Sequence, residues 1–186
     1  IKYDVNINKL ILERAQNNIN IFKYSLVAYL LVFILILINW ILESFKIKIS
    51  SSIIPKVAFV IALLSFFAHT YGIITRMIIM ERPPVSTLYE SIIFVGFIIM
   101  LISLIIEWIR KDTLGLFVGT LGGVILHFIA LKYANDGDTL GVLVAVLNSN
   151  FWLSIHVTTI TFGYGVSLVT GLMAHLFLLQ SSINTD

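Results

Sequence analysis

The stretch TLYESIIFVGFIIMLISLII, residues 87–106, decides the fold. It contains no charged residue after Glu90, and its remaining side chains are almost all apolar. Because a helix needs about 20 mostly apolar residues to cross the hydrocarbon core of a bilayer, this stretch predicts a membrane-spanning helix. Thr87 and Glu90 have the spacing of a capping box, in which each side chain satisfies a free backbone amide. The helix is therefore expected to begin at this pair.

The composition of the whole chain agrees with a membrane protein. Of the 186 residues, 59% are hydrophobic and only 12% are charged, whereas soluble domains have about 25% charged residues. The net charge of +2 is small and scattered, so no nucleic acid partner is expected. The chain has no cysteine, which excludes disulfides, thiolate metal sites and covalent attachment of haem to this chain.

Four further apolar stretches resemble the first one. The five predicted spans lie at about residues 21–42, 55–80, 88–108, 113–131 and 150–179. The apolar segment 140–147 is too short to span, and we expect a short helix at the outer interface there. The chain is thus predicted to be an all-α, polytopic transmembrane helix bundle over residues 21–186. Residues 1–20 are polar, and we expect them to end an external segment of a longer protein.

Glycines recur at every fourth position in the fourth predicted span. Gly115, Gly119 and Gly123 share one helix face. A stripe of small residues lets the backbone of a neighbouring helix approach closely. We interpret this stripe as a packing surface.

Lysine and arginine residues in the short loops indicate how the bundle is oriented. Lys46, Lys48, Lys56, Arg110 and Lys111 lie at one end of the spans. At the other end lie Arg76, Arg82 and Lys132, together with Lys2, Lys9, Arg14 and Lys23 around the N-terminal segment, so the raw count is nearly even. Cytoplasmic loops carry an excess of positive charge, whereas charges in a long translocated segment carry little weight. If residues 1–20 belong to such a segment, the first end is cytoplasmic. The turn around Pro83 and the start of the last span then face outward.

Four histidines in or at the predicted spans are the strongest candidates for chemistry. They are His69, His127, His156 and His175. An ionisable side chain inside a bilayer is costly unless it is paired, which makes each one a candidate functional residue. His69 and His127 lie about 14 residues from the cytoplasmic ends of their spans, so they could meet at one level. His175 has apolar neighbours, and we expect it to hydrogen-bond to a neighbouring helix.

His156 is placed differently from the other three. It lies within two turns of the outward end of the last span, near Trp152, which is expected to anchor the helix in the headgroup belt. We therefore expect the imidazole at the outer surface of the membrane.

The histidines favour haem over a bare metal ion. No carboxylate or thiolate lies near them in the sequence to complete a small-metal cage. Haem iron already has four ring nitrogens and needs only one or two histidines, and a bundle with 12% aromatic residues can enclose the macrocycle. One reading is a b-type cytochrome subunit that holds haem between His69 and His127 for electron transfer.

Two segments carry a more specific signal. Trp152-Leu-Ser-Ile-His156-Val, followed by Gly163-Tyr-Gly165, resembles the segment with the first external histidine of the CcsA/CcsBA cytochrome c synthetases, the System II haem handling and attachment proteins. His69-Thr-Tyr-Gly72, Arg76 and the run Arg82-Pro-Pro-Val-Ser-Thr-Leu-Tyr89-Glu90-Ser91 are similar to an upstream segment of that family. Together the two segments cover about a quarter of the chain.

This resemblance implies a function in cytochrome c maturation. Proteins of the family export haem b and present it to the CxxCH motif of an apocytochrome c, where thioether bonds form. His156 would then be an external axial ligand of the haem iron, and the turn from Pro83 to Ser91 would lie at the external site. His69 would be either a ligand for haem in transit or one partner of a helix–helix hydrogen bond. The site would face the periplasm, or the outside, of a bacterial inner membrane.

The resemblance also implies parts that residues 1–186 do not contain. The tryptophan-rich WWD segment of the family, its flanking span histidine and its second external histidine are absent here. We expect these parts, and a CcsB-type half, elsewhere in a holocytochrome c synthase, or haem lyase. Residues 1–186 alone are then not expected to be active.

Each remaining candidate haem contact has a structural alternative. Glu90 is explained by the capping box, or else it orients the haem or its thiol partner. Arg82 and Lys132 would pair with a haem propionate or else with lipid headgroups. Tyr89 and Trp152 are either interface anchors or haem contacts.

Overall fold

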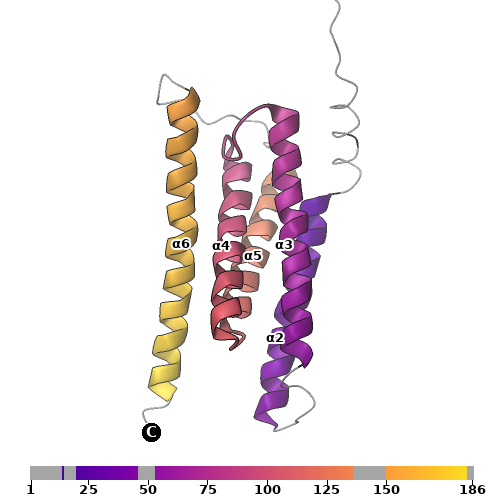
Figure 1. Cartoon of the computed structure of the whole chain (residues 1–186), viewed down its shortest axis with the longest axis vertical. Helices are drawn as coiled ribbons and strands as arrows, with labels where there is room; N and C mark the ends of the chain where they lie inside the picture. Colours follow the sequence, from indigo (N-terminus) through magenta and orange to yellow (C-terminus); the bar gives the residue numbers. More distant parts are fainter. Residues whose placement is uncertain (1–13, 15–19, 46–52, 136–149, 184–186) are drawn as a thin grey trace, which may run out of the picture.

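The fold is a set of five long helices. The computed structural model describes Arg14 and residues 20–45, 53–135 and 150–183, and the regular secondary structure in these ranges is entirely helical. The helices are α2 (Ile21–Ser44), α3 (Ile53–Met80), α4 (Leu88–Arg110), α5 (Leu114–Asn135) and α6 (Asn150–Ile183) (Figure 1). All five are long and apolar enough to cross a membrane. The predicted all-α, multi-span membrane bundle is therefore confirmed.

The helix bounds follow the predicted spans closely. The largest differences are at α5 and α6, which continue past the expected ends of their spans to Asn135 and Ile183. The expected interfacial helix at 140–147 lies outside the described residues, as does nearly all of the expected external segment 1–20. These two features stay predictions.

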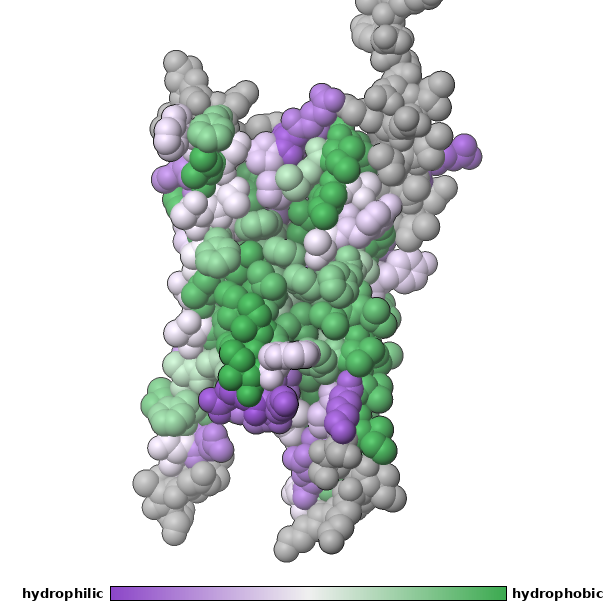
Figure 2. Space-filling view, viewed as in Figure 1, coloured by the Kyte–Doolittle hydropathy of each residue, from purple (hydrophilic) through white to green (hydrophobic). Residues whose placement is uncertain are grey.

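Successive helices run in opposite directions throughout, from α2 to α6 (Figure 1). One end of the bundle holds Met80, Leu88, Asn135 and Asn150, and we call it the Pro83 end. The other holds Ser44, Ile53, Arg110 and Leu114, and we call it the Lys111 end. Hydrophilic residues gather towards the two ends, and an apolar band lies between them (Figure 2). This distribution is that of a protein surrounded by lipid at its middle.

The helices form a packed group of four with α6 at one side. α4 packs against α5, and α2 packs against both α3 and α5, whereas α6 packs mainly on α4 (Figure 1). The main core between the four helices contains Tyr29, Val32, Ile36, Ala58, Ala62, Phe66, Met100, Leu104 and Leu116. α4 therefore links the core of the group to α6.

The glycine stripe of α5 lets α4 approach closely, as its spacing predicts. A Cβ atom on Gly115 would lie 2.6 Å from the carbonyl oxygen of Ser103, and one on Gly119 would lie 2.6 Å from the Cβ of the same serine. Gly123 instead faces the ring of Tyr29 in α2, where a Cβ would lie 3.2 Å from a ring carbon. The stripe thus packs α5 against two neighbours.

Polar side chains fix both ends of α4. At its start the capping box is present, because Thr87 Oγ1 accepts from the Glu90 N–H at 3.0 Å and Glu90 Oε2 accepts from the Thr87 N–H at 3.1 Å. At its end Lys111 adopts a left-handed conformation, and the buried carboxylate of Glu107 accepts from the backbone N–H of Thr113 at 3.1 Å. Each carboxylate satisfies amides that would otherwise be unpaired at a helix end.

The position of α6 depends on a close approach to α4. A Cβ atom on Gly165 would lie 2.5 Å from Cγ2 of Ile98, so the two helix surfaces touch at this glycine. Nearer the Pro83 end, Val157 packs against the buried cluster of Val85, Phe94 and Ile98. Gly163, two residues away from Gly165, has no neighbouring atom within 4 Å of its would-be Cβ.

Gly165→Leu is therefore expected to push α6 away from α4, whereas Gly163→Leu should be tolerated. Overpacking costs about 1–3 kcal/mol of unfolding free energy, and the lost contacts of Val157 would add to it. Each variant is purified in mild detergent, and a denaturing detergent is then added stepwise. The measurement is the midpoint of unfolding. Equal midpoints for the two leucine variants would show that Gly165 is not a packing contact.

Candidate functional site

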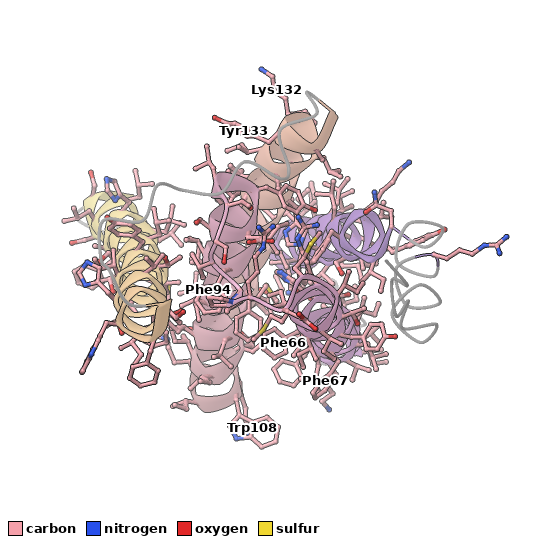
Figure 3. All side chains as sticks on the ribbon, turned by 90° about the horizontal axis from the view of Figure 1, so that it is seen from above. Phe66, Phe67, Phe94, Trp108, Lys132 and Tyr133 are labelled. Carbon is pink, nitrogen blue, oxygen red and sulfur yellow. The ribbon has the colours of Figure 1, made fainter. Side chains whose placement is uncertain are left out.

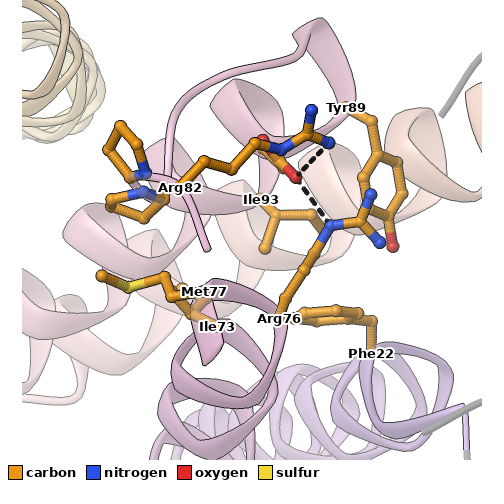
Figure 4. Close-up of a pocket in the computed structure, with 10 residues that line it drawn as sticks. Phe22, Ile73, Arg76, Met77, Arg82, Tyr89 and Ile93 are labelled. Carbon is orange, nitrogen blue, oxygen red and sulfur yellow. Dashed lines mark hydrogen bonds and ion pairs between the residues drawn. The ribbon is translucent and has the colours of Figure 1, made fainter. Parts of the chain in front are cut away.

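A buried ion-pair cluster lies at the Pro83 end. The carboxylate of Glu90, at the start of α4, is 5% exposed. Its Oε1 accepts from Arg76 Nε at 2.9 Å, and Arg82 Nη2 approaches the same oxygen at 3.4 Å (Figure 4). Arg76 comes from the last turns of α3 and Arg82 from the turn that follows it. The cluster therefore joins α3, the turn and α4.

The second oxygen of Glu90 is used by the backbone. Oε2 accepts from the N–H groups of Ser86 and Thr87 at 3.0 and 3.1 Å. Glu90 thus combines the predicted capping role with two ion pairs. The sequence indicates Arg76 only as a loop charge and as part of a motif, because Arg76 and Glu90 lie on different helices with a turn between them. Only the fold reveals this pair.

Tyr89 lies inside the cluster rather than at the membrane interface. Its side chain is 6% exposed, and the guanidinium of Arg76 lies 4.9 Å from the centre of its ring. The ring also meets Phe22 of α2 edge-on, with 6.3 Å between centroids. Of the two alternatives for Tyr89, the exposed interface anchor does not fit this burial. Trp152, by contrast, is exposed on α6 beside Phe151.

His69 and His127 meet in the interior of the bundle. Neither imidazole is exposed, and their ring centroids are 4.5 Å apart in an edge-to-face arrangement. His127 Nδ1 lies 2.8 Å from the carbonyl oxygen of Gly123, and His69 Nδ1 lies 3.2 Å from the hydroxyl of Tyr29. Since a carbonyl only accepts, the proton of neutral His127 is on Nδ1 and its Nε2 carries a lone pair. Neither Nε2 atom has a hydrogen-bond partner among the described residues.

This pair is too close to hold a haem between its members. An imidazole nitrogen lies on the order of 2 Å from a metal that it binds, so two ligands on opposite sides of one iron have nitrogens about 4 Å apart. The ring centroids would then be farther apart than the 4.5 Å observed. The pair also contacts Phe22, Tyr29 and Phe97 directly. The alternative of a b-type cytochrome with haem between His69 and His127 is not favoured.

His156 lies on a different element from the buried pair. It is exposed on α6, seven residues into a helix that begins at Asn150, and its ring has no hydrogen bond to a described residue. The neighbouring Val157 packs against the cluster of Val85, Phe94 and Ile98, which joins the turn after α3 to α4. The structure therefore packs the His156 end of α6 against this cluster, and it places His69 elsewhere, within the four-helix group.

Two other residues considered from the sequence lie apart from this region. Lys132 is exposed near the end of α5 and points away from the helices (Figure 3). His175 is exposed, and its Nδ1 bonds to the carbonyl oxygen of Gly171 in its own helix at 2.6 Å. The expected bond from His175 to a neighbouring helix is therefore wrong, because the carbonyl one turn earlier already takes the ring proton.

The described residues contain no group of three histidine, aspartate or glutamate side chains that could hold a metal ion. What they contain is a buried cluster of two arginines and one carboxylate at the Pro83 end, with an exposed imidazole on the adjacent helix. The fold and these residues define a multi-span helical membrane protein with a polar site at one end.

Comparison with known proteins gives a more specific classification. Protein NrfI of Wolinella succinogenes is 28% identical over 190 residues, which cover 96% of this chain and 20% of NrfI. Cytochrome c biogenesis protein CcsA of Trieres chinensis is 32% identical over 77% of this chain and 46% of that protein. CcsA of Spinacia oleracea is 31% identical over 63% of this chain and 36% of that protein. No family model matches the chain.

These relatives confirm the resemblance predicted from the two sequence segments. The chain is homologous to the CcsA cytochrome c biogenesis proteins and to NrfI over most of its own length. It spans between one fifth and about one half of the length of these curated relatives.

Glu90→Gln is expected to destabilise the Pro83 end strongly. The substitution leaves two largely buried guanidinium groups without their carboxylate, and breaking such a pair costs about 3–5 kcal/mol of unfolding free energy. The measurement is the unfolding midpoint in detergent. Asp112→Asn is the matched control, because its ion pair with Arg110 is exposed and such pairs contribute at most about 1 kcal/mol. A loss no larger than that of the control would contradict the structural role of Glu90.

Proposed function

We propose that this chain is part of a membrane cytochrome c synthetase that exports haem and presents it for attachment to an apocytochrome c. The observation that carries the proposal is the homology to CcsA cytochrome c biogenesis proteins, which extends over 77% of the chain in one relative. The two sequence segments that resemble the family also contribute to one hydrophobic cluster towards the Pro83 end, in which Val157 packs against Val85, Phe94 and Ile98. The b-type cytochrome alternative explains neither fact.

His156 is the proposed iron ligand of this chain. A neutral imidazole suits haem iron, and this one is accessible on α6 rather than committed to another described residue. The helix that carries it is fixed by the contact of Gly165 with Ile98 and by the packing of Val157. A ligand held on a rigid helix keeps its nitrogen at a fixed position relative to the turn, as presentation to a partner requires.

Haem b is the proposed substrate, and it passes through the protein rather than staying in it. The apolar band of the bundle would cover the macrocycle while the imidazole holds the iron. At the outer face, each thiol of the CxxCH motif adds across one vinyl group of the haem. The S–H bond and the vinyl double bond are replaced by S–C and C–H bonds, so no oxidant is needed. The histidine of the motif then replaces an imidazole on the iron, which releases the product.

The remaining parts of the proposal concern location and partners. We place the protein in a bacterial inner membrane with its Pro83 end towards the periplasm, the orientation that the lysine and arginine residues favour when those of residues 1–20 are set aside. A CcsB-type half, fused or separate, and an apocytochrome c are the proposed partners. The activity is that of the complete protein, a holocytochrome c synthase.

His156→Ala is expected to abolish formation of c-type cytochrome, because the iron loses an axial ligand. The measurement is haem staining of a CxxCH-containing cytochrome co-expressed with the complete protein, and exogenous imidazole is expected to restore part of the signal. His175→Ala is the control, since that ring lies on the same helix and bonds to the carbonyl oxygen of Gly171 within it. Normal staining with His156→Ala, at equal protein abundance, would overturn the assignment.

A further inference from the structure

The two arginines at the Pro83 end are not equivalent. Arg76 Nε donates to Glu90 Oε1 at 2.9 Å, and its guanidinium also lies over the ring of Tyr89. Arg82 reaches the same oxygen only at 3.4 Å, which is at the long limit of a hydrogen bond. Arg76 is therefore the firm partner of Glu90, and Arg82 is the weakly held one.

Arg82 also has hydrogen-bonding capacity that the structure does not use. Its Nε atom is buried and has no hydrogen-bond partner among the described residues. A guanidinium has five N–H donors in a fixed fork, and burying one of them unpaired costs free energy. The side chain is only 21% exposed, so water does not simply replace the missing partner.

Glu90 cannot supply that partner. Its Oε1 is shared by both arginines, and its Oε2 accepts from the amides of Ser86 and Thr87. Each carboxylate oxygen has two lone pairs, so all four directions are taken. A second carboxylate would satisfy the fork of Arg82 in the bidentate geometry that arginine favours.

The structure offers room for a small acidic group beside Arg82. The pocket there is lined by Arg76, Arg82, Glu90, Met77 and the prolines Pro83 and Pro84 (Figure 4). Its free volume is about 10 Å³, which is close to the space of one water molecule. A carboxylate oxygen fits such a space, whereas a macrocycle does not. The body of a ligand would have to lie outside this pocket.

We infer that Arg82 is the binding group for a carboxylate side arm of the transported haem, and that Arg76 keeps Glu90 in place when Arg82 engages this ligand. The inference rests on the proposed function, because haem is the substrate that it supplies with carboxylates. It also distinguishes between Arg82 and Lys132, the two cations that the sequence suggests as partners of a haem propionate. Lys132 is exposed and points away from the bundle (Figure 3), whereas Arg82 lies three residues before Val85, which belongs with Phe94 and Ile98 to the cluster that Val157 of α6 packs against.

The test compares two ligands that differ only in their acidic groups. Haem b and haem b dimethyl ester, which lacks free carboxylates, are titrated into the complete protein in phosphatidylcholine nanodiscs, and the Soret band gives each Kd. Arg82→Gln is expected to weaken haem b binding about tenfold, the usual worth of a charged hydrogen bond, and to leave the ester unchanged. Lys132→Gln should change neither Kd. Arg82→Lys keeps the charge and is expected to bind haem b with intermediate affinity.

Several outcomes overturn the inference. Equal losses for haem b and its ester in Arg82→Gln, or no loss for either, would mean that Arg82 does not bind the carboxylate. If Arg82→Gln fails to fold, the same comparison with Arg82→Lys decides, and an unchanged haem b affinity there counts against the inference. If phosphatidylglycerol in the nanodiscs weakens haem b binding in the wild type but not in Arg82→Gln, the occupant is a lipid phosphate. Failure of the proposed function looks different, because then neither macrocycle binds to any variant.

Discussion

The Pro83 end of the bundle depends on one buried carboxylate. A buried carboxylate needs hydrogen-bond partners within the protein, because water does not reach it to replace them. Glu90 meets this requirement for three segments at once, since it caps α4, holds α3 through Arg76 and fixes the turn through Ser86. The geometry of the proposed external site therefore follows from the way this carboxylate is satisfied.

α6 extends that geometry towards the proposed haem ligand. The helix meets the rest of the bundle mainly at α4, where Gly165 touches Ile98 and Val157 packs against the cluster of Val85, Phe94 and Ile98. His156 directly precedes Val157 in the chain, but it is exposed. An exposed imidazole and a weakly held arginine towards the same end of the bundle suit a ligand with a metal at its centre and acids at its edge.

Much of the fold could be predicted from local sequence. Apolar stretches of bilayer length predict the spans, the Thr87–Glu90 spacing predicts the start of α4, and the glycine stripe predicts the close approach of α5 to α4. These features depend on neighbours within one helical turn or on helix length alone. Equal depth also predicted that His69 and His127 could meet.

The rest depends on contacts between distant segments, which no local pattern encodes. The pairing of Arg76 with Glu90 crosses a turn, and the bond of His69 with Tyr29 joins residues 40 positions apart. The burial of Tyr89 likewise follows from Phe22 of another helix. Local sequence therefore does not determine whether an aromatic or charged residue near a span end is buried in the bundle or exposed at the interface.

The central claim is that the imidazole of His156 binds haem iron. The most direct measurement is the electron paramagnetic resonance spectrum of the complete, ferric haem-loaded protein, compared with that of its His156→Ala variant. The account predicts a low-spin, bis-imidazole signal in the wild type that becomes high-spin in the variant. A variant spectrum identical to that of the wild type would contradict it.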